Sequence, residues 1–154
     1  MANTYTQINI HAVFSVKGRG NFIKSKFRDE LHKYISGIIN EKGNYSLAVN
    51  GYKDHVHVFF ELNPTKAVSD VIRDIKANSS KWINEKRFLP GKFEWQSGYG
   101  AFSYSKSQRD GVIQYIMKQE EHHKEKTFRE EYLALLDKFD IAFDDHYVFD
   151  FYDE

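Results

Sequence analysis

The chain has 154 residues, of which 41% are hydrophobic and 16% aromatic, and its formal net charge is zero. This length and apolar content predict one compact domain with its own core and fit two domains poorly. The chain contains no cysteine, which excludes disulfides and thiolate metal sites. No apolar run approaches the roughly 20 residues that span a bilayer, and residues 1–4 lack the features of a secretory signal. We therefore expect a cytoplasmic protein with no membrane partner.

The charges are distributed unevenly along the chain. Residues 17–33 contain six basic and two acidic residues, and residues 66–92 contain seven basic and three acidic residues, so each stretch carries +4. Residues 119–154 contain four basic and twelve acidic residues, a net charge of −8. The body of the protein is therefore basic, which suits phosphate binding, although solvated helix faces explain the same charges equally well.

The first element is predicted from an alternating pattern between Thr6 and Val16. Its apolar residues face one way and its polar residues, including His11, face the other, which is typical of a half-buried strand. A basic loop follows at residues 17–21. Residues 25–42 then carry apolar residues at helical spacing, and Gly43 supplies the C-terminal stop.

Two strands are then expected to form a hairpin. Residues 45–49 read as the first strand, residues 50–53 as the turn and residues 54–61 as the second strand. Pro64 opens a second helix, which ends before Pro90 and Gly91.

The remaining third of the chain predicts short strands and two further helices. Residues 93–97 and 101–104 read as short strands, and Ser107 is placed to cap a third helix. Residues 127–130 match a capping box that starts a fourth helix, which runs to about Phe139. We expect one domain at residues 1–139, followed by an acidic tail at residues 140–154 whose pattern fits a docked arm and a frayed end equally.

The order of these elements predicts an α+β fold. Strand–helix–strand–strand–helix–strand is the split βαβ pattern of a ferredoxin-like sandwich, an antiparallel sheet with helices on one face. The additional C-terminal helices follow this unit. The second face of the sheet is expected to be free to carry a site.

The most informative feature is the pair His55 and His57 in the second strand of the hairpin. Residues i and i+2 of a strand point to the same face, so both imidazoles project together and form half of a metal site. Histidine, carboxylate, amide and water ligands favour Mg²⁺ or Mn²⁺ and leave Zn²⁺ possible. Asp54 is placed to orient one imidazole from behind the ligands. A pair of ordinary hydrogen-bonded strand histidines is the simpler alternative.

The third helix offers the partners for these histidines. Two imidazoles alone hold Mg²⁺ or Mn²⁺ poorly, and Gln119 is placed to add an amide oxygen. Tyr115 lies four residues earlier, on the same helix face. The combination indicates metal-assisted phosphoryl transfer with tyrosine as the nucleophile. Taken singly, Tyr115 is better explained as a packing residue and Gln119 as a solvent-exposed residue. His122 and His123 more often contact phosphate or solvent than a metal.

Three blocks, Asp54–His57, Trp95–Ser103 and Tyr115–His123, occur in this order. Together they resemble the single-tyrosine HUH transposases of small insertion sequences, the IS-two-hundred-like transposases. The resemblance implies a ferredoxin-like fold, a homodimer, and the binding of single-stranded DNA with hairpin ends.

The same resemblance also implies the site and its chemistry. A Mg²⁺ or Mn²⁺ ion would be held by His55, His57 and Gln119. Tyr115 would attack a DNA phosphate, leaving a 5′-phosphotyrosine link and a free 3′-hydroxyl. In relatives the tyrosine helix can reach the partner subunit, so a site shared across the dimer stays open.

Phosphate contacts are predicted for the basic residues of the first loop and for the helical histidine pair. These nucleic-acid-binding candidates are Lys17, Arg19, Lys24, His122 and His123. Two other functions remain possible: an inactive or domesticated relative that only binds hairpin single-stranded DNA or RNA, and a metal phosphoesterase with water as nucleophile. The intact His55, His57, Tyr115 and Gln119 argue against the inactive relative.

Overall fold

The computed structural model describes residues 3–152 of the protein. Its centre is a four-stranded antiparallel sheet with the strand order β2-β3-β1-β4. The strands are β1 (Asn9–Ser15), β2 (Tyr45–Gly51), β3 (His55–Glu61) and β4 (Gly100–Tyr104). The chain order β1-α1-β2-β3-α2-β4 confirms the predicted ferredoxin-like sandwich.

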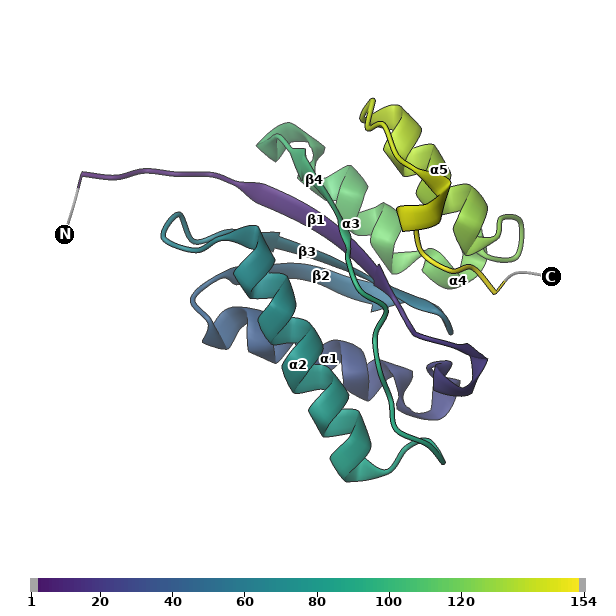
Figure 1. Ribbon diagram of the computed structural model, residues 1–154. Coiled ribbons are helices and arrows are strands. Elements are labelled where there is room, and N and C mark those ends of the chain that lie inside the picture. Colours follow the sequence, from purple (N-terminus) through teal and green to yellow (C-terminus); the bar gives the residue numbers. More distant parts are fainter. Residues whose placement is uncertain (1–2, 153–154) are drawn as a thin grey trace.

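Helices cover both faces of this sheet (Figure 1). Helices α1 (Ser25–Glu41) and α2 (Val68–Lys86) pack on one face. Helices α3 (Arg109–Met117), α4 (Gln119–His122) and α5 (Phe128–Lys138) lie over the other face. Short 3₁₀ turns occur at Arg19–Asn21, Lys106–Gln108 and Asp145–Tyr147. None of the helices within residues 3–152 is long and apolar enough to cross a membrane.

The larger core lies between the sheet and helices α1 and α2. The side chains of Val56, Val58 and Phe60 on β3 are fully buried there, together with Ile35 of α1 and Ile75 of α2. In β3 these residues alternate with His55 and His57, so apolar packing on one face fixes both imidazoles on the opposite face.

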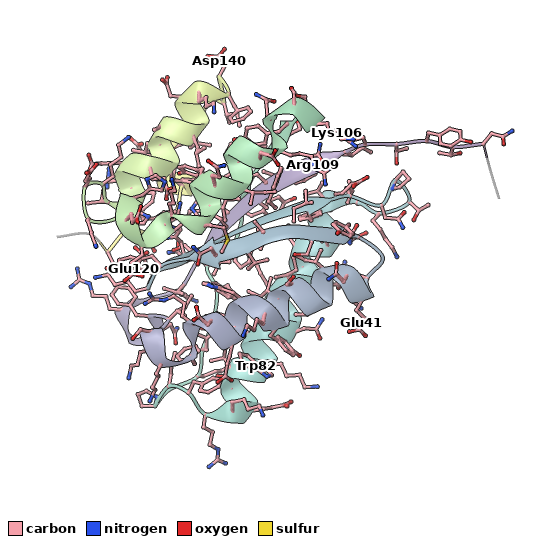
Figure 2. All side chains as sticks on the ribbon, turned by 180° about the vertical axis from the view of Figure 1, so that it is seen from behind. Glu41, Trp82, Lys106, Arg109, Glu120 and Asp140 are labelled. Atoms are coloured by element: carbon pink, nitrogen blue, oxygen red, sulfur yellow. The ribbon has the colours of Figure 1, made fainter. Side chains whose placement is uncertain are left out.

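The opposite face is closed, whereas the sequence led us to expect it to be free. Seen from behind, side chains fill the space between the sheet and the C-terminal helices (Figure 2). Phe59 packs there against Val112 and Ile116 of α3. All seven residues of β1 are buried, so the prediction of a half-exposed strand is wrong. The helices that cover His11 and its polar neighbours come from a distant part of the chain.

Other differences are local. Helix α2 begins at Val68 rather than at Pro64, because a turn closed by the Lys66 amide on the Asn63 carbonyl precedes it. Residues 93–97 form a single bridge, Trp95 with Val16, instead of a strand. Ser105 rather than Ser107 supplies the cap, and its capping box with Gln108 closes the 3₁₀ turn that leads into α3. The predicted capping box at Thr127 is confirmed.

The C-terminal tail is a docked arm up to Tyr152. Phe149 is buried against Phe128 and Tyr132 of α5. The Asp150 amide donates to Gln96 Oε1 at 2.8 Å, and the Tyr152 hydroxyl accepts a hydrogen bond from the Gly18 amide. The predicted tail also includes residues 153–154, which lie outside the described residues.

Candidate active site

The site forms where β3 passes beneath the C-terminal helices. His55 and His57 lie on β3, which is flanked by β2 and β1, and both are completely buried. The His55 ring stacks on Phe128 of α5, with centroids 4.0 Å apart. The rigid central strand and the packed helix above it therefore hold the imidazole orientation.

Three imidazoles are each held at Nδ1. His55 Nδ1 lies 2.7 Å from Asp54 Oδ1, as expected from the sequence. His57 Nδ1 lies 2.7 Å from His11 Nε2 on β1, and His123 Nδ1 lies 2.8 Å from the Lys126 carbonyl oxygen. A partner at Nδ1 fixes the ring and turns Nε2 toward the opposite side, which is how metal-ligating histidines are commonly oriented.

All three Nε2 atoms face one carboxylate, that of Glu131 on α5. Glu131 Oε1 lies 3.4 Å from Nε2 of His55 and 3.2 Å from Nε2 of both His57 and His123. His55, His57 and Glu131 offer ligand atoms within 4.8 Å of one another, an arrangement that could hold a metal ion. The buried donor set therefore fits a divalent cation.

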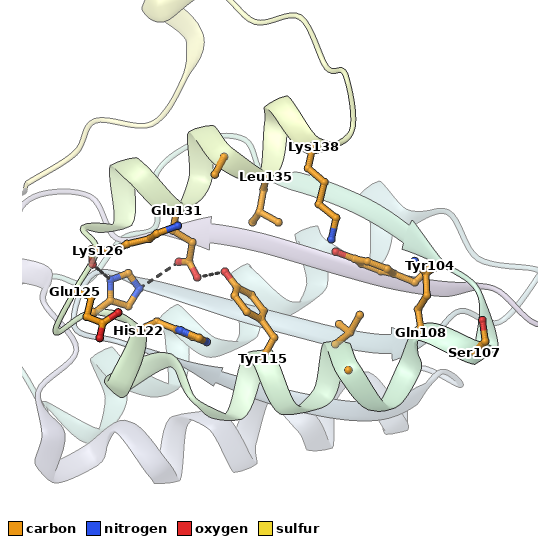
Figure 3. A pocket seen from close by; sticks show the side chains of 14 residues that line it. Tyr104, Ser107, Gln108, Tyr115, His122, Glu125, Lys126, Glu131, Leu135 and Lys138 are labelled. Carbon is orange, nitrogen blue, oxygen red and sulfur yellow. Dashed lines mark hydrogen bonds and ion pairs between the residues drawn. The ribbon is translucent and has the colours of Figure 1, made fainter.

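Gln119 and Tyr115 reach the same carboxylate. Gln119 is fully buried, its Oε1 lies 2.9 Å from His55 Nε2, and its Nε2 donates to Glu131 Oε2 at 2.7 Å. The half-buried Tyr115 donates its hydroxyl hydrogen bond to Glu131 Oε2 (Figure 3). The four residues that the sequence linked are thus brought together within a single chain.

The helix that carries Tyr115 and Gln119 is not continuous, contrary to the sequence prediction. Helix α3 ends at Met117, and Lys118 separates it from α4. The Lys118 amide bonds the Tyr115 carbonyl at 3.3 Å, a tightened last turn. The two side chains therefore meet at Glu131 across a break, rather than along one regular face.

Burial and charge within the site shift the pKa values of its histidines in opposite directions. Burial alone would lower the pKa of His55, but the Asp54 and Glu131 carboxylates outweigh it and raise this pKa to about 9. Burial lowers the pKa of His57, and burial with the neighbouring His57 lowers the pKa of His11. These shifts favour an imidazolium at His55 and neutral rings at His57 and His11.

The carboxylate and the phenol respond in the expected way. Burial would raise the pKa of Glu131, but the imidazoles of His57, His123 and His55 hold it well below its usual value. Burial, and then the negative charge of Glu131, raise the pKa of Tyr115 above its usual value. The phenol is therefore protonated and serves as a hydrogen-bond donor in this arrangement.

The remaining predicted residues lie around the site rather than in it. Lys17 and Lys24 are exposed, and Lys17 lies 3.8 Å from Glu94. Arg19 lines a cavity of about 460 Å³ that also reaches Tyr52 and His123. His122 contacts the Tyr115 ring, with centroids 4.8 Å apart. The His123 side chain is buried in the cluster of imidazoles, whereas Lys17 and Lys24 are exposed.

A second cavity opens between α3 and α5, with Tyr115 and Glu131 on its wall (Figure 3). Its volume is about 570 Å³, and Lys126 and Lys138 are among its lining residues. His123 and Lys126 line both cavities. The loop at residues 123–126 therefore lies between the two cavities.

The sequence analysis missed Glu131 and His11. Glu131 shares its helix face with Phe128, Tyr132 and Leu135, which are all buried. A carboxylate on the apolar stripe of an amphipathic helix was the available signal, because an unpaired charge is rarely buried. His11 gave a weaker signal, since an alternating strand with one polar face looks half exposed.

Comparison with known proteins places the chain among transposases. Residues 4–119 match the family described as "Transposase IS200 like". The ISDra2 transposase TnpA of Deinococcus radiodurans is 25% identical over 124 residues, which cover 77% of this chain and 87% of the relative.

Two solved structures share the fold. A Deinococcus radiodurans crystal structure described as a transposase superposes with a TM-score of 0.61 and 21% identity, over 77% of this chain and 95% of that chain. A REP-associated tyrosine transposase bound to a REP hairpin gives a TM-score of 0.58 and 14% identity, over 80% of this chain and 73% of that chain. The family match ends at Gln119, so His123 and Glu131 lie beyond it.

Proposed function

Because the chain belongs to the family of IS200-like transposases, we propose that it cleaves and rejoins single-stranded DNA through a covalent link to Tyr115. The observation that supports this proposal is the contact of one buried carboxylate with the Tyr115 hydroxyl, the Gln119 amide and the two β3 imidazoles. A nucleophile, a metal-binding group and their orienting partners thus share one location.

In the proposed reaction the Tyr115 oxygen forms a bond to the phosphorus of a DNA phosphodiester. The bond from phosphorus to the 3′ oxygen breaks, which leaves a 5′-phosphotyrosine and a strand that ends in a 3′-hydroxyl after that oxygen takes up a proton. The phenol proton leaves toward Glu131 Oε2, which already accepts the Tyr115 hydrogen bond. Rejoining reverses these steps with another 3′-hydroxyl, so no external energy source is consumed.

We propose that His55, His57 and Gln119 bind a divalent ion, with Mg²⁺ and Mn²⁺ as the candidates. When bound, the ion would polarise the phosphate and stabilise the charge that develops on it. Asp54 holds His55 from behind, through the 2.7 Å contact at Nδ1. The burial and shared direction of the donor atoms support this assignment.

The proposed substrate is single-stranded DNA with hairpin ends. We expect Lys17, Arg19 and Lys24 to contact phosphates. In support, Arg19 lines the cavity that reaches His123, and His122 lines the cavity beside Tyr115. Binding of this kind weakens steeply as salt rises, because neutralised phosphates release counterions. A titration of hairpin-DNA affinity against NaCl concentration measures this slope, and a salt-independent affinity would contradict the proposed contacts.

We also propose a homodimer whose two sites each form within one chain. In support, Tyr115 of this chain already contacts its own Glu131, and its ring centroid lies 5.9 Å from that of its own His57. A mixture of His57→Ala and Tyr115→Phe proteins tests this arrangement. Restored cleavage in the mixture would show a shared site, whereas light scattering reports the dimer itself.

The decisive experiment is covalent capture. The protein is incubated with Mn²⁺ and single-stranded oligonucleotides that carry the ends of the element, and a denaturant-stable adduct is expected. Tyr115→Phe should abolish the adduct, whereas Tyr147→Phe, a change at an exposed tyrosine, should retain it. Cleavage without an adduct in Tyr115→Phe would instead indicate water as the nucleophile.

A second candidate function is a relative that binds hairpin single-stranded DNA or RNA without cutting it. The observation that favours it is the pKa of Tyr115, which burial and the charge of Glu131 raise, so that the phenol is a poor nucleophile. Tight hairpin binding without any adduct, with Mg²⁺ and Mn²⁺ both tested, would support this function over transposition.

A further inference from the structure

His123 and Glu131 lie beyond the residues that match the family, and both side chains are directed toward Nε2 of His55 and His57 or toward each other. We propose that His123 and Glu131 complete the ion site, so that it binds a divalent transition-metal ion such as Mn²⁺ or Zn²⁺ in preference to Mg²⁺. This inference rests on the proposed function, because it extends the ion site of His55, His57 and Gln119. It adds two ligands and a selectivity that the resemblance does not imply.

The first argument for this site is the set of distances between its donor atoms. Two donors bound to one ion at about 2.0–2.2 Å lie roughly 2.8–3.6 Å apart for tetrahedral or octahedral angles. Glu131 Oε1 lies 3.2–3.4 Å from the three imidazole Nε2 atoms. Gln119 Oε1 lies 2.9 Å from His55 Nε2 and 3.0 Å from His123 Nε2. Each of these pairwise separations fits two ligands of a common ion. The ligand atoms of His55, His57 and Glu131 all lie within 4.8 Å of one another, and His123 joins this group through its contacts with Gln119 and Glu131.

The setting of His123 carries the second step. Its side chain is only 3% exposed, its ring stacks on Tyr52 with centroids 5.4 Å apart, and its Nδ1 faces the Lys126 carbonyl oxygen. These contacts fix the ring and leave Nε2 directed at Gln119 and Glu131. A histidine that only met DNA phosphates would need its imidazole exposed, so this burial favours a ligand.

The chemistry of the donors carries the third step. Mg²⁺ prefers oxygen ligands, keeps several waters and is seldom held by an all-protein cage. Imidazole nitrogen suits Zn²⁺ and its first-row neighbours, and affinity for a mixed nitrogen and oxygen site rises from Mn²⁺ to Zn²⁺. A third imidazole and a carboxylate therefore move the selectivity away from Mg²⁺.

Calorimetric titration of the full chain with MgCl₂, MnCl₂ and ZnCl₂, without DNA, tests this inference. We expect Zn²⁺ to bind most tightly, Mn²⁺ next and Mg²⁺ most weakly. His123→Ala and Glu131→Gln should each weaken Mn²⁺ and Zn²⁺ binding by roughly 100-fold or more, since even outer residues of metal sites are worth about 10–100-fold. Equal Mg²⁺ and Mn²⁺ affinities, or unchanged Mn²⁺ and Zn²⁺ affinities in both variants, would overturn the proposal.

Neighbouring residues of the same types give matched controls. His122→Ala and Glu130→Gln remove an imidazole and a carboxylate that do not contact the three Nε2 atoms, and Gln at position 130 can still serve the capping box at Thr127. Both controls should bind Mn²⁺ and Zn²⁺ as the unmodified chain does. A loss as large as that in His123→Ala would show a general effect on the helices and overturn the assignment.

A measurement on the unmodified chain covers the case in which the variants fail to fold. X-ray absorption of the Zn²⁺-loaded protein should show three imidazole ligands, and two would overturn the role of His123. The covalent-capture experiment is separate from these titrations. An adduct together with Mg²⁺ binding equal to that of Mn²⁺ would refute only this inference, whereas selective binding without an adduct would refute only the transposase activity.

Discussion

Residues 4–119, which match the family, and residues 120–152, which follow, contribute to the site in different ways. The first region builds the sheet and supplies His55, His57, Tyr115 and Gln119 from β3, α3 and the start of α4. The second region supplies a covering helix, a third imidazole and the carboxylate that touches all the others. The first region alone would leave the histidine face of the sheet partly open.

The difference shows that one region can position the residues of a candidate site while another sets its charge. In the first region the site residues are fixed by strand alternation and sheet packing, which are properties of the fold. In the second region Glu131 is fixed by the apolar stripe of α5, which packs on the same face. Charge and ligand number can therefore change in the second region without disturbing the sheet.

The largest effect is expected when α5 and the tail, which form most of the second region, are removed. Deleting residues 127–154 would expose the surface now covered by five buried side chains: Phe128, Tyr132, Leu135, Leu136 and Phe149. At about 1.5–3 kcal/mol each, their loss amounts to about 8–15 kcal/mol, as large as the whole stability of a typical domain. We expect the shortened chain to lose its cooperative thermal transition in calorimetry.

A smaller deletion serves as the control for that experiment. Removing residues 141–154 keeps α5 and loses only Phe149 from the five buried side chains, so a cooperative transition at a lower temperature is expected. If the chain without residues 127–154 melted like the intact protein, the two regions would be energetically independent and the comparison would fail.

The next effect concerns charge shared between the regions. His55 has its pKa raised to about 9 by Asp54 in the first region and Glu131 in the second. Because protonated His55 is favoured in the folded state, it stabilises the fold by about 3 kcal/mol at pH values below the unfolded pKa of 6.5. This stabilisation is lost as the pH rises through 9, where His55 loses its proton in the folded state. In EDTA, unfolding free energy should therefore fall between pH 6 and pH 10.

Single variants measure how much each of the two carboxylates raises the pKa of His55. Asp54→Asn and Glu131→Gln should each lower the pKa of His55 in an NMR titration and flatten the fall in stability, whereas Glu130→Gln should leave the titration unchanged. An unaltered His55 titration in Glu131→Gln would mean that α5 does not hold its carboxylate against the imidazole in solution.

Most of the fold could be predicted because its signals are local. The alternation from His55 to Glu61, the helical spacing around Ile35 and the capping box at Thr127 each depend on neighbours a few residues away, and each matches the structure. Tyr115 and Gln119 were also predictable as a pair, although their helix breaks between them, because both side chains lie within one turn of the break.

The rest of the site depends on packing between distant segments, which periodicity does not report. The burial of His11 follows from helices that begin about a hundred residues later in the chain. No neighbour in the sequence indicates the role of Glu131, because its partners lie on β3 and α3, far away in the chain. An acidic residue on an apolar stripe indicates such a site only once the helix face is known to be buried.

A third prediction tests the contact between the regions at a single glycine. A Cβ added to Gly100 on β4 would lie 2.5 Å from the Tyr132 hydroxyl oxygen of α5, so Gly100→Ala should destabilise the protein by about 1–3 kcal/mol. The double variant Gly100→Ala, Tyr132→Leu should lose less unfolding free energy than the two single variants together, because Tyr132→Leu removes the hydroxyl that clashes with the new Cβ. Denaturant unfolding of the four proteins gives this coupling directly.

Gly111 in α3 provides the control for that cycle, because nothing lies within 4 Å of the position of its Cβ. Gly111→Ala should stabilise the helix by about 0.4–1 kcal/mol and show no coupling with Tyr132→Leu. Additive effects of Gly100→Ala and Tyr132→Leu would contradict the close approach of β4 and α5.

The smallest expected change in stability comes from the hydrogen bonds between the C-terminal tail and the loop before β4. Gln96 Oε1 accepts from the Asp150 amide and Gln96 Nε2 donates to the Asp150 carbonyl, each at 2.8 Å. Because these bonds are partly exposed, Gln96→Ala should cost about 1 kcal/mol and speed hydrogen exchange at the Asp150 amide. Gln96→Glu keeps the acceptor and should protect that amide more than alanine does. Equal exchange in all three proteins would mean that the aromatic contacts of Phe149 alone hold the tail.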